Sequence, residues 1–250
     1  MECQRRATII ISLLLISNSI TLIYFYPKEV APPGGEKFAA YEEVIRTYQG
    51  DPLALPEPER SGFITVEEAI ASRRSRRKYS HDPLALPQVS QLLWAAQGIT
   101  SEDGKRTTPS AGAIYPLKIY LVARNVHGFE NGVYHYIVEE HKLGKLLDER
   151  VFEAFFEVAG QPYSKKAAVT FIITVNYPKV AQKYKGEELK RFALQESGHV
   201  GQNLYLQGES LGLAMVVVGE FDTQGVKEVL DFPDQETAVY LIPVGSKMLE

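Results

Sequence analysis

The sequence predicts a protein of fold class α+β, in which one domain follows an apolar N-terminal segment. Between residues 61 and 250, stretches with strand-like apolar patterning are interspersed with stretches at helical spacing. Of the 250 residues, 45% are hydrophobic and 23% are charged, which are ordinary globular values and exclude a wholly disordered or collagen-like chain. The formal net charge of −4 gives no overall basic field, so we expect no nucleic acid partner.

Residues 7–27 carry no charged side chain and follow Arg5 and Arg6. A helix of about 20 residues spans the roughly 30 Å hydrocarbon core of a bilayer. We therefore predict a single N-terminal transmembrane or signal helix in residues 1–27. An uncleaved membrane anchor is favoured, and a cleaved signal peptide or a soluble helix are the alternatives. The two arginines favour a domain outside the cytoplasm, which would be secreted if the signal is cleaved.

Residues 28–60 are rich in proline, glycine and glutamate, as in the stretch APPGGEK. This composition is typical of a linker, so we place the folded domain at residues 61–250.

Three helices are predicted in the domain. Thr65 and Glu68 form a capping-box pattern that begins a helix ending near Arg73. A second helix covers residues 87–97 and ends before Gly98, and a long third helix covers residues 189–211. Strands are predicted at residues 117–124, 133–138, 168–176, 213–219 and 238–245.

The densest charge on the chain is the run Arg73-Arg-Ser-Arg-Arg-Lys78. Guanidinium groups pair bidentately with phosphate oxygens, and a serine hydroxyl adds a donor. The run therefore indicates a cradle for a small phosphate-bearing ligand. A solvated surface cluster and a nucleic acid patch are the alternatives, and the second is disfavoured because no aromatic residues are interleaved.

Two further segments could carry chemistry. Residues 108–116 (TPSAGAIYP) contain small residues that let the backbone approach a flat ligand closely, although a plain turn would explain them locally. Lys183 and Tyr184 follow the third predicted strand, and both side chains can transfer protons if their pKa values are tuned. Without further context this pair would be an exposed loop.

Other common sites are not indicated. The segment Gly208-Glu-Ser-Leu-Gly212 matches a nucleophile elbow, but a helix precedes it and a strand follows it, which is the wrong order. No phosphate-binding P-loop and no dinucleotide-binding glycine motif occurs. The single cysteine and the scattered histidines predict no metal site.

Taken together, the sequence resembles the flavin-dependent nitroreductase superfamily, and within it the SagB/ThcOx-type dehydrogenases, which include azoline oxidases. The resemblance covers about residues 63–246. It rests on eight segments in the family's order: RRSRRKY, QLLWAAQGIT, TPSAGAIYPLKIYLV, GVYHY, KY, ESGHVGQNLYLQ, VVVGEFD and YLIPVG.

The resemblance implies a sandwich of a mainly antiparallel sheet with flanking helices, and a homodimer that shares two FMN sites. It implies that Arg73, Arg74, Ser75 and Arg77 hold the FMN phosphate and ribityl chain, with a weaker carry-over for Lys247. Pro109, Ser110 and Ala111 match the loop that the other subunit contributes. Val217, Val218 and Gly219 match the backbone along the flavin ring. Glu220 is one position away from a glutamate of the relatives, so no role is assigned to it.

Lys183 and Tyr184 match the pair that azoline-oxidising members use as base and helper. The resemblance therefore implies an FMN-dependent oxidoreductase that dehydrogenates an azoline-type heterocycle in a small molecule or peptide. An NAD(P)H-dependent nitro or quinone reductase and a non-catalytic flavin-binding protein are the alternatives.

Overall fold

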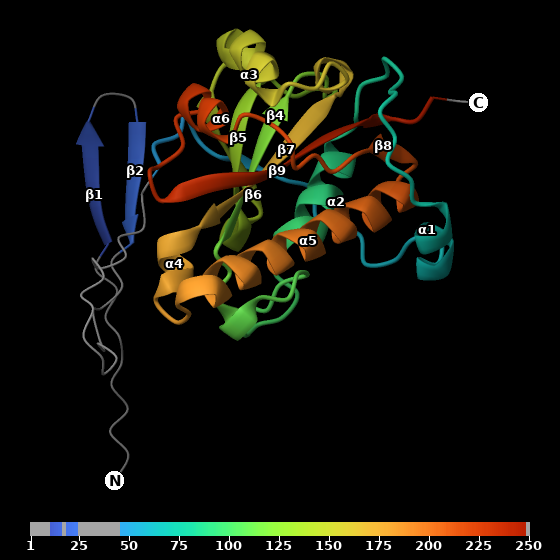
Figure 1. The fold of residues 1–250 in the computed structure, drawn as a ribbon. Coiled ribbons are helices and arrows are strands. Elements are labelled where there is room, and N and C mark those ends of the chain that lie inside the picture. The colour runs from blue at the N-terminus through green and yellow to red at the C-terminus, as the bar shows by residue number, and fades with distance from the viewer. Residues whose placement is uncertain (1–10, 17–18, 25–45, 249–250) are drawn as a thin grey trace.

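The computed structural model describes residues 11–16, 19–24 and 46–248, and it confirms the α+β class. A sheet in the order β3-β6-β5-β4-β7-β9-β8 lies between helices, and each neighbouring pair of strands is antiparallel (Figure 1). In chain order the strands of this sheet are β3 (Leu53–Ala54), β4 (Leu117–Ala123), β5 (Gly132–Ile137), β6 (Lys142–Leu147), β7 (Val169–Asn176), β8 (Leu213–Met215) and β9 (Glu236–Ser246).

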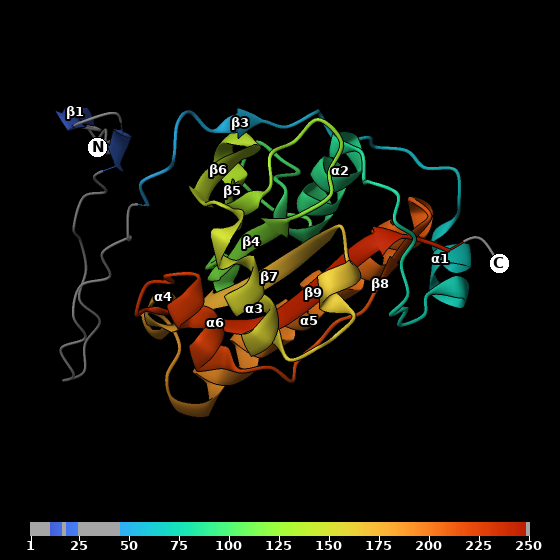
Figure 2. The ribbon, with the colours of Figure 1, turned by 90° about the horizontal axis from the view of Figure 1, so that it is seen from above.

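Helices cover both faces of the sheet. The helices are α1 (Val66–Ser72), α2 (Leu86–Gln97), α3 (Phe152–Ala159), α4 (Tyr177–Ala181), α5 (Gly186–Ser210) and α6 (Thr223–Val229), with short 3-10 turns that include η1 (Ala111–Ala113). Helices α2 and α5 cover one face, and α3 and α6 cover the other (Figures 1 and 2).

Strand β4 shows how the two cores form. Leu117, Ile119 and Leu121 join the core beneath α2 and α5, whereas Tyr120 and Val122 join the core beneath α3 and α6. Successive side chains of a strand point to opposite faces, so a central strand that is apolar on both faces holds the two layers together.

The capping box predicted before α1 is confirmed. The Glu68 N–H donates to Thr65 Oγ1 at 3.2 Å, and the Thr65 N–H donates to Glu68 Oε2 at 2.7 Å. Strand β6 and helices α3, α4 and α6 were not predicted, because each has eight residues or fewer and gives little periodic signal. The apolar run at residues 213–219 is a strand only to Met215, and Val218 then returns as a single bridge to Leu241 of β9.

The predicted N-terminal helix is wrong for the described part of the apolar segment. Residues Ile11–Ile16 (β1) and Ser19–Tyr24 (β2) form an antiparallel hairpin. Isoleucine, threonine and tyrosine recur in these stretches, and such β-branched and aromatic residues favour strands over helices. Among the residues that the structure describes, no helix combines the length and the apolar character needed to cross a membrane. The rest of the predicted 1–27 segment lies outside the described residues.

Part of the predicted linker lies against the sheet. Residues 28–45 are outside the described residues, but Leu53–Ala54 pairs with β6 and Leu55 is buried in the core. The Gln91 side chain of α2 accepts from the Glu59 N–H at 2.8 Å and donates to the Glu59 carbonyl at 3.1 Å. From β3 the chain then runs along the outside of the molecule to α1 (Figure 2).

Candidate functional site

Helix α5 separates two groups of candidate residues. The basic end, near the C-terminus of α5, consists of Arg73, Arg74, Ser75, Arg76, Arg77, Tyr205, Glu209 and Lys247. The loop end, toward its N-terminus, consists of residues 108–116 with Lys183, Tyr184 and Glu196. Phe192, whose ring contacts Tyr184, is about 20 Å of helix rise from Tyr205. Within one chain the two groups therefore do not form a single pocket.

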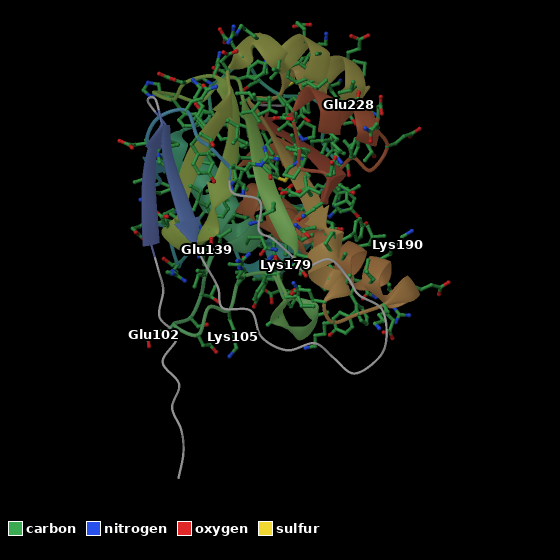
Figure 3. All side chains as sticks on the ribbon, turned by 90° about the vertical axis from the view of Figure 1, so that its left-hand side faces the viewer. Glu102, Lys105, Glu139, Lys179, Lys190 and Glu228 are labelled. Atoms are coloured by element: carbon green, nitrogen blue, oxygen red, sulfur yellow. The ribbon has the colours of Figure 1, made fainter. Side chains whose placement is uncertain are left out.

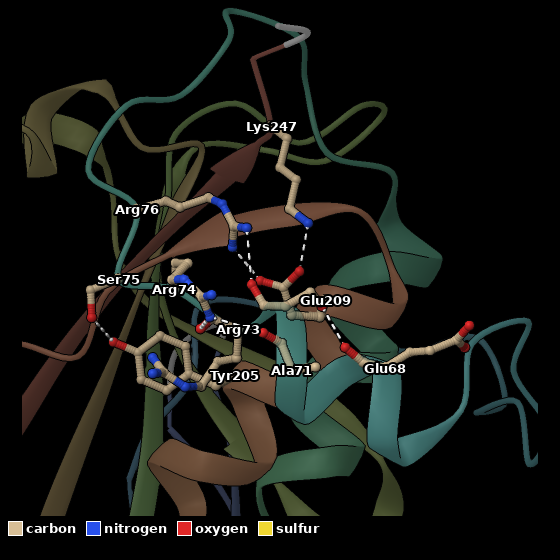
Figure 4. Close-up of polar contacts among 10 residues, drawn as sticks. Glu68, Ala71, Arg73, Arg74, Ser75, Arg76, Tyr205, Glu209 and Lys247 are labelled. Carbon is tan, nitrogen blue, oxygen red and sulfur yellow. Dashed lines mark hydrogen bonds and ion pairs between the residues drawn. The ribbon is translucent and has the colours of Figure 1, made fainter.

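Tyr205 organises the basic end. Its hydroxyl accepts from the Val217 N–H at 2.9 Å and lies 2.9 Å from Ser75 Oγ (Figure 4). The Arg73 guanidinium lies 4.8 Å from the centre of the Tyr205 ring, a cation–π distance. Three residues assigned from the resemblance are thus brought together by a residue to which the sequence assigned no role. Tyr205 lies inside the motif ESGHVGQNLYLQ, which was the available signal.

Glu209 neutralises two of the cations. It forms ion pairs with Arg76 and with Lys247, whose Nζ lies 2.7 Å from Glu209 Oε2 (Figure 4). Burial by itself would raise the pKa of Glu209, but the hydrogen bonds from Lys247 and Arg76 outweigh it and hold the pKa below its ordinary value. Arg76 was missing from the residues assigned by resemblance, and Lys247, which was assigned to a phosphate, is held by a carboxylate.

The other arginines differ in what they contact. Arg74 donates to the carbonyls of Ala71 at 2.9 Å and Arg73 at 2.8 Å, so it caps the end of α1. Arg77 is exposed, with its guanidinium 5.8 Å from the Tyr163 ring centre. Among the described residues, no carboxylate forms an ion pair with Arg73 or Arg77. These two guanidinium groups and the Ser75 hydroxyl are donors of the kind that bind phosphate oxygens.

The segment assigned to the flavin ring is only partly open. Val217 is half-buried and its N–H is engaged by Tyr205. Val218 is buried, and its N–H and carbonyl both bond to Leu241 at 2.8 and 3.0 Å. Gly219 is exposed.

The loop end contains a strained backbone. Gly112, Ala113 and Tyr115 have φ values of +62°, +54° and +49°, a region that residues with a Cβ rarely adopt. The Tyr115 N–H donates to Ser110 Oγ at 2.9 Å, and the Ala113 N–H donates to the Ser110 carbonyl at 3.0 Å. Lys179 Nζ donates to the Tyr115 carbonyl at 3.1 Å. Such strain persists only where surrounding contacts hold it, and it is typical of functional sites.

Lys183 and Tyr184 lie against this loop. A Cβ at Gly112 would collide with Lys183 Nζ and Cε, so the end of the exposed lysine side chain lies directly against this glycine. Lys183 Nζ is 5.9 Å from the centre of the Tyr184 ring, and that ring packs edge-on against Phe192 at 4.6 Å. The structure therefore brings the predicted lysine–tyrosine pair to the predicted loop. Pro109 is exposed beside them.

Glu196 lies beneath the loop and was not predicted. Its side chain is buried, at 3% exposure, and lines a cavity of about 10 Å³ together with Ser110, Ala111 and Tyr184. Burial raises its pKa to about 7, against hydrogen bonds from Ser110 and Gln97 and the charges of Arg106 and Lys179. In the described part of the chain, no group of three histidine, cysteine, aspartate or glutamate side chains could hold a metal ion.

Comparisons with known proteins show the family of the chain. The family model described as "Nitroreductase family" matches residues 70–246. The chain is 40% identical over 197 residues to "Putative nitroreductase MJ1384" of Methanocaldococcus jannaschii, covering 78% of this chain and 96% of that protein.

A second relative is more distant and longer. The "Trifolitoxin-processing protein TfxB" of Rhizobium leguminosarum bv. trifolii is 29% identical over 119 residues, which cover 46% of this chain and 32% of that protein. Among solved structures, a protein of Ralstonia eutropha described as a "putative nitroreductase" superposes with a TM-score of 0.70 and 25% identity, over 80% of this chain and 90% of that chain.

Proposed function

The chain belongs to the nitroreductase family and is an oxidoreductase, and from this premise we propose that it uses FMN to oxidise azoline-type heterocycles. The observation that carries the proposal is that Lys183 lies against the strained loop at Gly112. The basic end, whose arginines and Ser75 would bind a phosphate, lies at the other end of α5. The SagB/ThcOx-type dehydrogenases, which the sequence resembles, are the corresponding class. The likeness to TfxB, which is named as a toxin-processing protein, supports a peptide substrate.

The basic end supports FMN as the cofactor. A phosphate monoester presents oxygens that Arg73 and Arg77 can bind as charge-assisted hydrogen bonds, with Ser75 as a further donor. Tyr205 fixes Ser75 and the Val217 backbone relative to each other, so the residues that would meet the phosphate and the ring are pre-positioned. When bound, FMN supplies a two-electron acceptor for hydride.

Lys183 supports the oxidation of an azoline. Conversion of a thiazoline or oxazoline to the aromatic azole removes one proton and one hydride from the ring. In the proposed reaction, Lys183 Nζ would accept the ring proton and Tyr184 would assist at the lysine, while bound FMN would supply the acceptor for the hydride. The end of the exposed Lys183 side chain lies against Gly112 of this loop.

We further propose that two copies of the chain form a homodimer with shared sites. Gly198 is at the midpoint of α5, and no heavy atom lies within 4 Å of a Cβ built there. Leu194, one turn earlier, is 49% exposed, and Val66 and Ile70 of α1 are also exposed. If two α5 helices cross at Gly198 about a two-fold axis, the loop end of one chain reaches the basic end of its partner.

A second candidate function follows from the likeness to the M. jannaschii protein. That protein is named as a nitroreductase and matches this chain over most of its length. An NAD(P)H-dependent nitro or quinone reductase would use the same cofactor site but would need no base at Lys183.

One assay of the FMN-loaded chain separates these functions. We expect wild type to oxidise a thiazoline-containing peptide, and Lys183→Ala to lose at least 100-fold of this rate while it keeps its FMN absorbance. Lys190→Ala is the matched control, because Lys190 is also an exposed lysine and lies on α5, a few residues further along the chain (Figure 3). NAD(P)H-driven reduction of a nitroaromatic, without azoline oxidation, would favour the second candidate. A chain that takes up no FMN would contradict both.

The dimer is tested by adding bulk at the proposed crossing. In sedimentation velocity we expect wild type and the control Lys190→Leu to be dimers and Gly198→Leu to be a monomer. Leucine favours a helix over glycine by roughly 0.8 kcal/mol, so a loss of dimer would not reflect a weaker helix. A Gly198→Leu chain that remains dimeric would contradict a close crossing at this position.

A further inference from the structure

Glu196 is a buried titratable group that lines one cavity with Ser110, Ala111 and Tyr184, and the proposed reaction makes no use of it. It lies on the inner side of the loop at residues 110–115, whereas Lys183 rests on the same loop at Gly112. Any change in how Glu196 holds the loop is therefore transmitted to the position of the lysine.

The side chains next to the Glu196 carboxyl, Gln97 and Ser110, are uncharged, and a hydroxyl can face either the carboxylate or the carboxylic acid. Gln97 Nε2 donates to Glu196 Oε1 across a long 3.5 Å, while Gln97 Oε1 accepts from Arg106 at 3.2 Å, which fixes the amide orientation. The Ser110 hydroxyl already accepts from the Tyr115 N–H, and Ser110 lines the same cavity as Glu196, where it lowers the pKa of Glu196 against the effect of burial. A hydroxyl can donate to a carboxylate or accept from a carboxylic acid, so Ser110 suits both states of Glu196.

Within residues 46–248, which the structure describes, no cation forms an ion pair with Glu196. Arg106 donates to Gln97 and to the exposed Glu139, and Lys179 of α4 donates to the Tyr115 carbonyl, so both act on Glu196 from a distance. Tyr184 lines the same cavity. A negative charge on Glu196 is thus poorly compensated. The ionised carboxylate is more stable if the loop opens and water reaches it.

We propose that Glu196 is a positioning residue whose protonated carboxyl holds the strained loop at residues 110–115 in place beneath Lys183, and that loss of this proton loosens the loop. The role in catalysis rests on the proposed function, but the titration of the loop does not. Because burial raises the pKa of Glu196 to about 7, the closed loop binds the proton more tightly than the open loop does. The loop is therefore held most firmly at acid pH and loosens as the pH rises toward 7.

Hydrogen exchange of the Tyr115 amide tests this directly, since that N–H donates to Ser110. Exchange of the full-length chain is followed by mass spectrometry on peptides covering residues 108–117, corrected for the intrinsic pH dependence. We expect wild-type protection to be about tenfold lower at about pH 7.5 than at about pH 5.5. Glu196→Gln, which cannot ionise, is expected to be equally protected at both pH values.

Glu139→Gln is the matched control. Glu139 bonds at 3.0 Å to Arg106, the arginine that also donates to Gln97, and its side chain is mostly exposed (Figure 3). Its substitution is expected to leave the wild-type pH dependence unchanged. Glu196→Ala, which removes the hydrogen bonds to the loop, is expected to be weakly protected at both pH values.

Three results would overturn the inference: wild-type protection that is the same at both pH values, a Glu196→Gln profile that matches wild type, or loss of the pH dependence in Glu139→Gln. The first needs no variant, so a variant that fails to fold does not remove the test. Repeating the exchange with FMN added separates the two proposals. A chain that binds no FMN but shows the expected titration would contradict the cofactor and support the role of Glu196.

Discussion

Glu196 and Glu209 lie on the same helix and have similarly small exposed surfaces, yet their pKa values are shifted in opposite directions. Their side chains belong to residues that are 3% and 8% exposed. Burial raises the pKa of Glu196 to about 7, whereas at Glu209 the hydrogen bonds from Lys247 and Arg76 outweigh burial and lower the pKa. Burial by itself therefore does not decide whether a carboxyl is ionised; the direct partner does.

The same difference separates the two ends of α5. At the basic end, Arg76 and Lys247 form ion pairs with Glu209, and the phenol of Tyr205 is hydrogen-bonded to Ser75, so direct partners hold these side chains. At the loop end, neutral hydrogen bonds hold a backbone with three left-handed residues. This end can change its protonation near neutral pH, which suits chemistry that moves a proton.

The largest effect is expected from Glu209→Gln. The change leaves the Arg76 and Lys247 cations facing each other without an anion, in a partly buried site. We expect the free energy of unfolding at pH 7 to fall by about 3 kcal/mol, measured by urea denaturation. Glu188→Gln, whose pair with Arg191 is exposed and 3.7 Å long, should lose under about 0.5 kcal/mol. Equal losses in the two variants would mean that the basic end is not held by Glu209.

The next effect is a difference between Arg77 and Arg74 in their contribution to FMN affinity. Arg77→Ala is expected to weaken FMN binding by about 10- to 100-fold, because a charge-assisted hydrogen bond contributes about 1.5–3 kcal/mol. Arg74→Ala should change FMN affinity much less, since Arg74 donates to backbone carbonyls at the end of α1. Fluorescence titration with FMN measures both, and a greater loss in Arg74→Ala would reverse the assignment.

The smallest effect is a decrease in the free energy of unfolding as the pH rises. The raised pKa of Glu196 means that the folded chain binds more protons than the unfolded chain between its ordinary value of 4.5 and about 7. Its contribution to stability is therefore full on the acid side and is lost as the pH rises, by about 2 kcal/mol between about pH 5.5 and pH 7.5. Urea denaturation should show this slope in wild type and in Glu139→Gln.

In Glu196→Gln that part of the slope should disappear, which would leave the variant more stable than wild type at about pH 7.5. A variant with the wild-type slope would show that another group titrates in this range, and the contrast between the two glutamates would fail.

Most of the fold could be predicted because its signals are local. The capping box of Thr65 and Glu68 and the stop at Gly98 depend on neighbouring residues, and both helix ends lie where the sequence placed them. The short elements and the hairpin at residues 11–24 could not be predicted with this reasoning. In the hairpin, an apolar run satisfied the length rule for a helix while its β-branched residues favoured strands.

The sequence by itself determined the order of the principal strands and helices, the resemblance to the family, and the segments that carry arginine, lysine and the small-residue loop. These features depend on residues that are close together in the chain, because secondary-structure propensity, helix capping and sequence motifs are all local. Only the tertiary structure decided that Arg76 pairs with Glu209 while the adjacent Arg77 does not, and that Glu196 lies beneath Ser110. Charge and protonation depend on partners that are far apart in the chain, so the roles of these residues follow from packing and not from spacing.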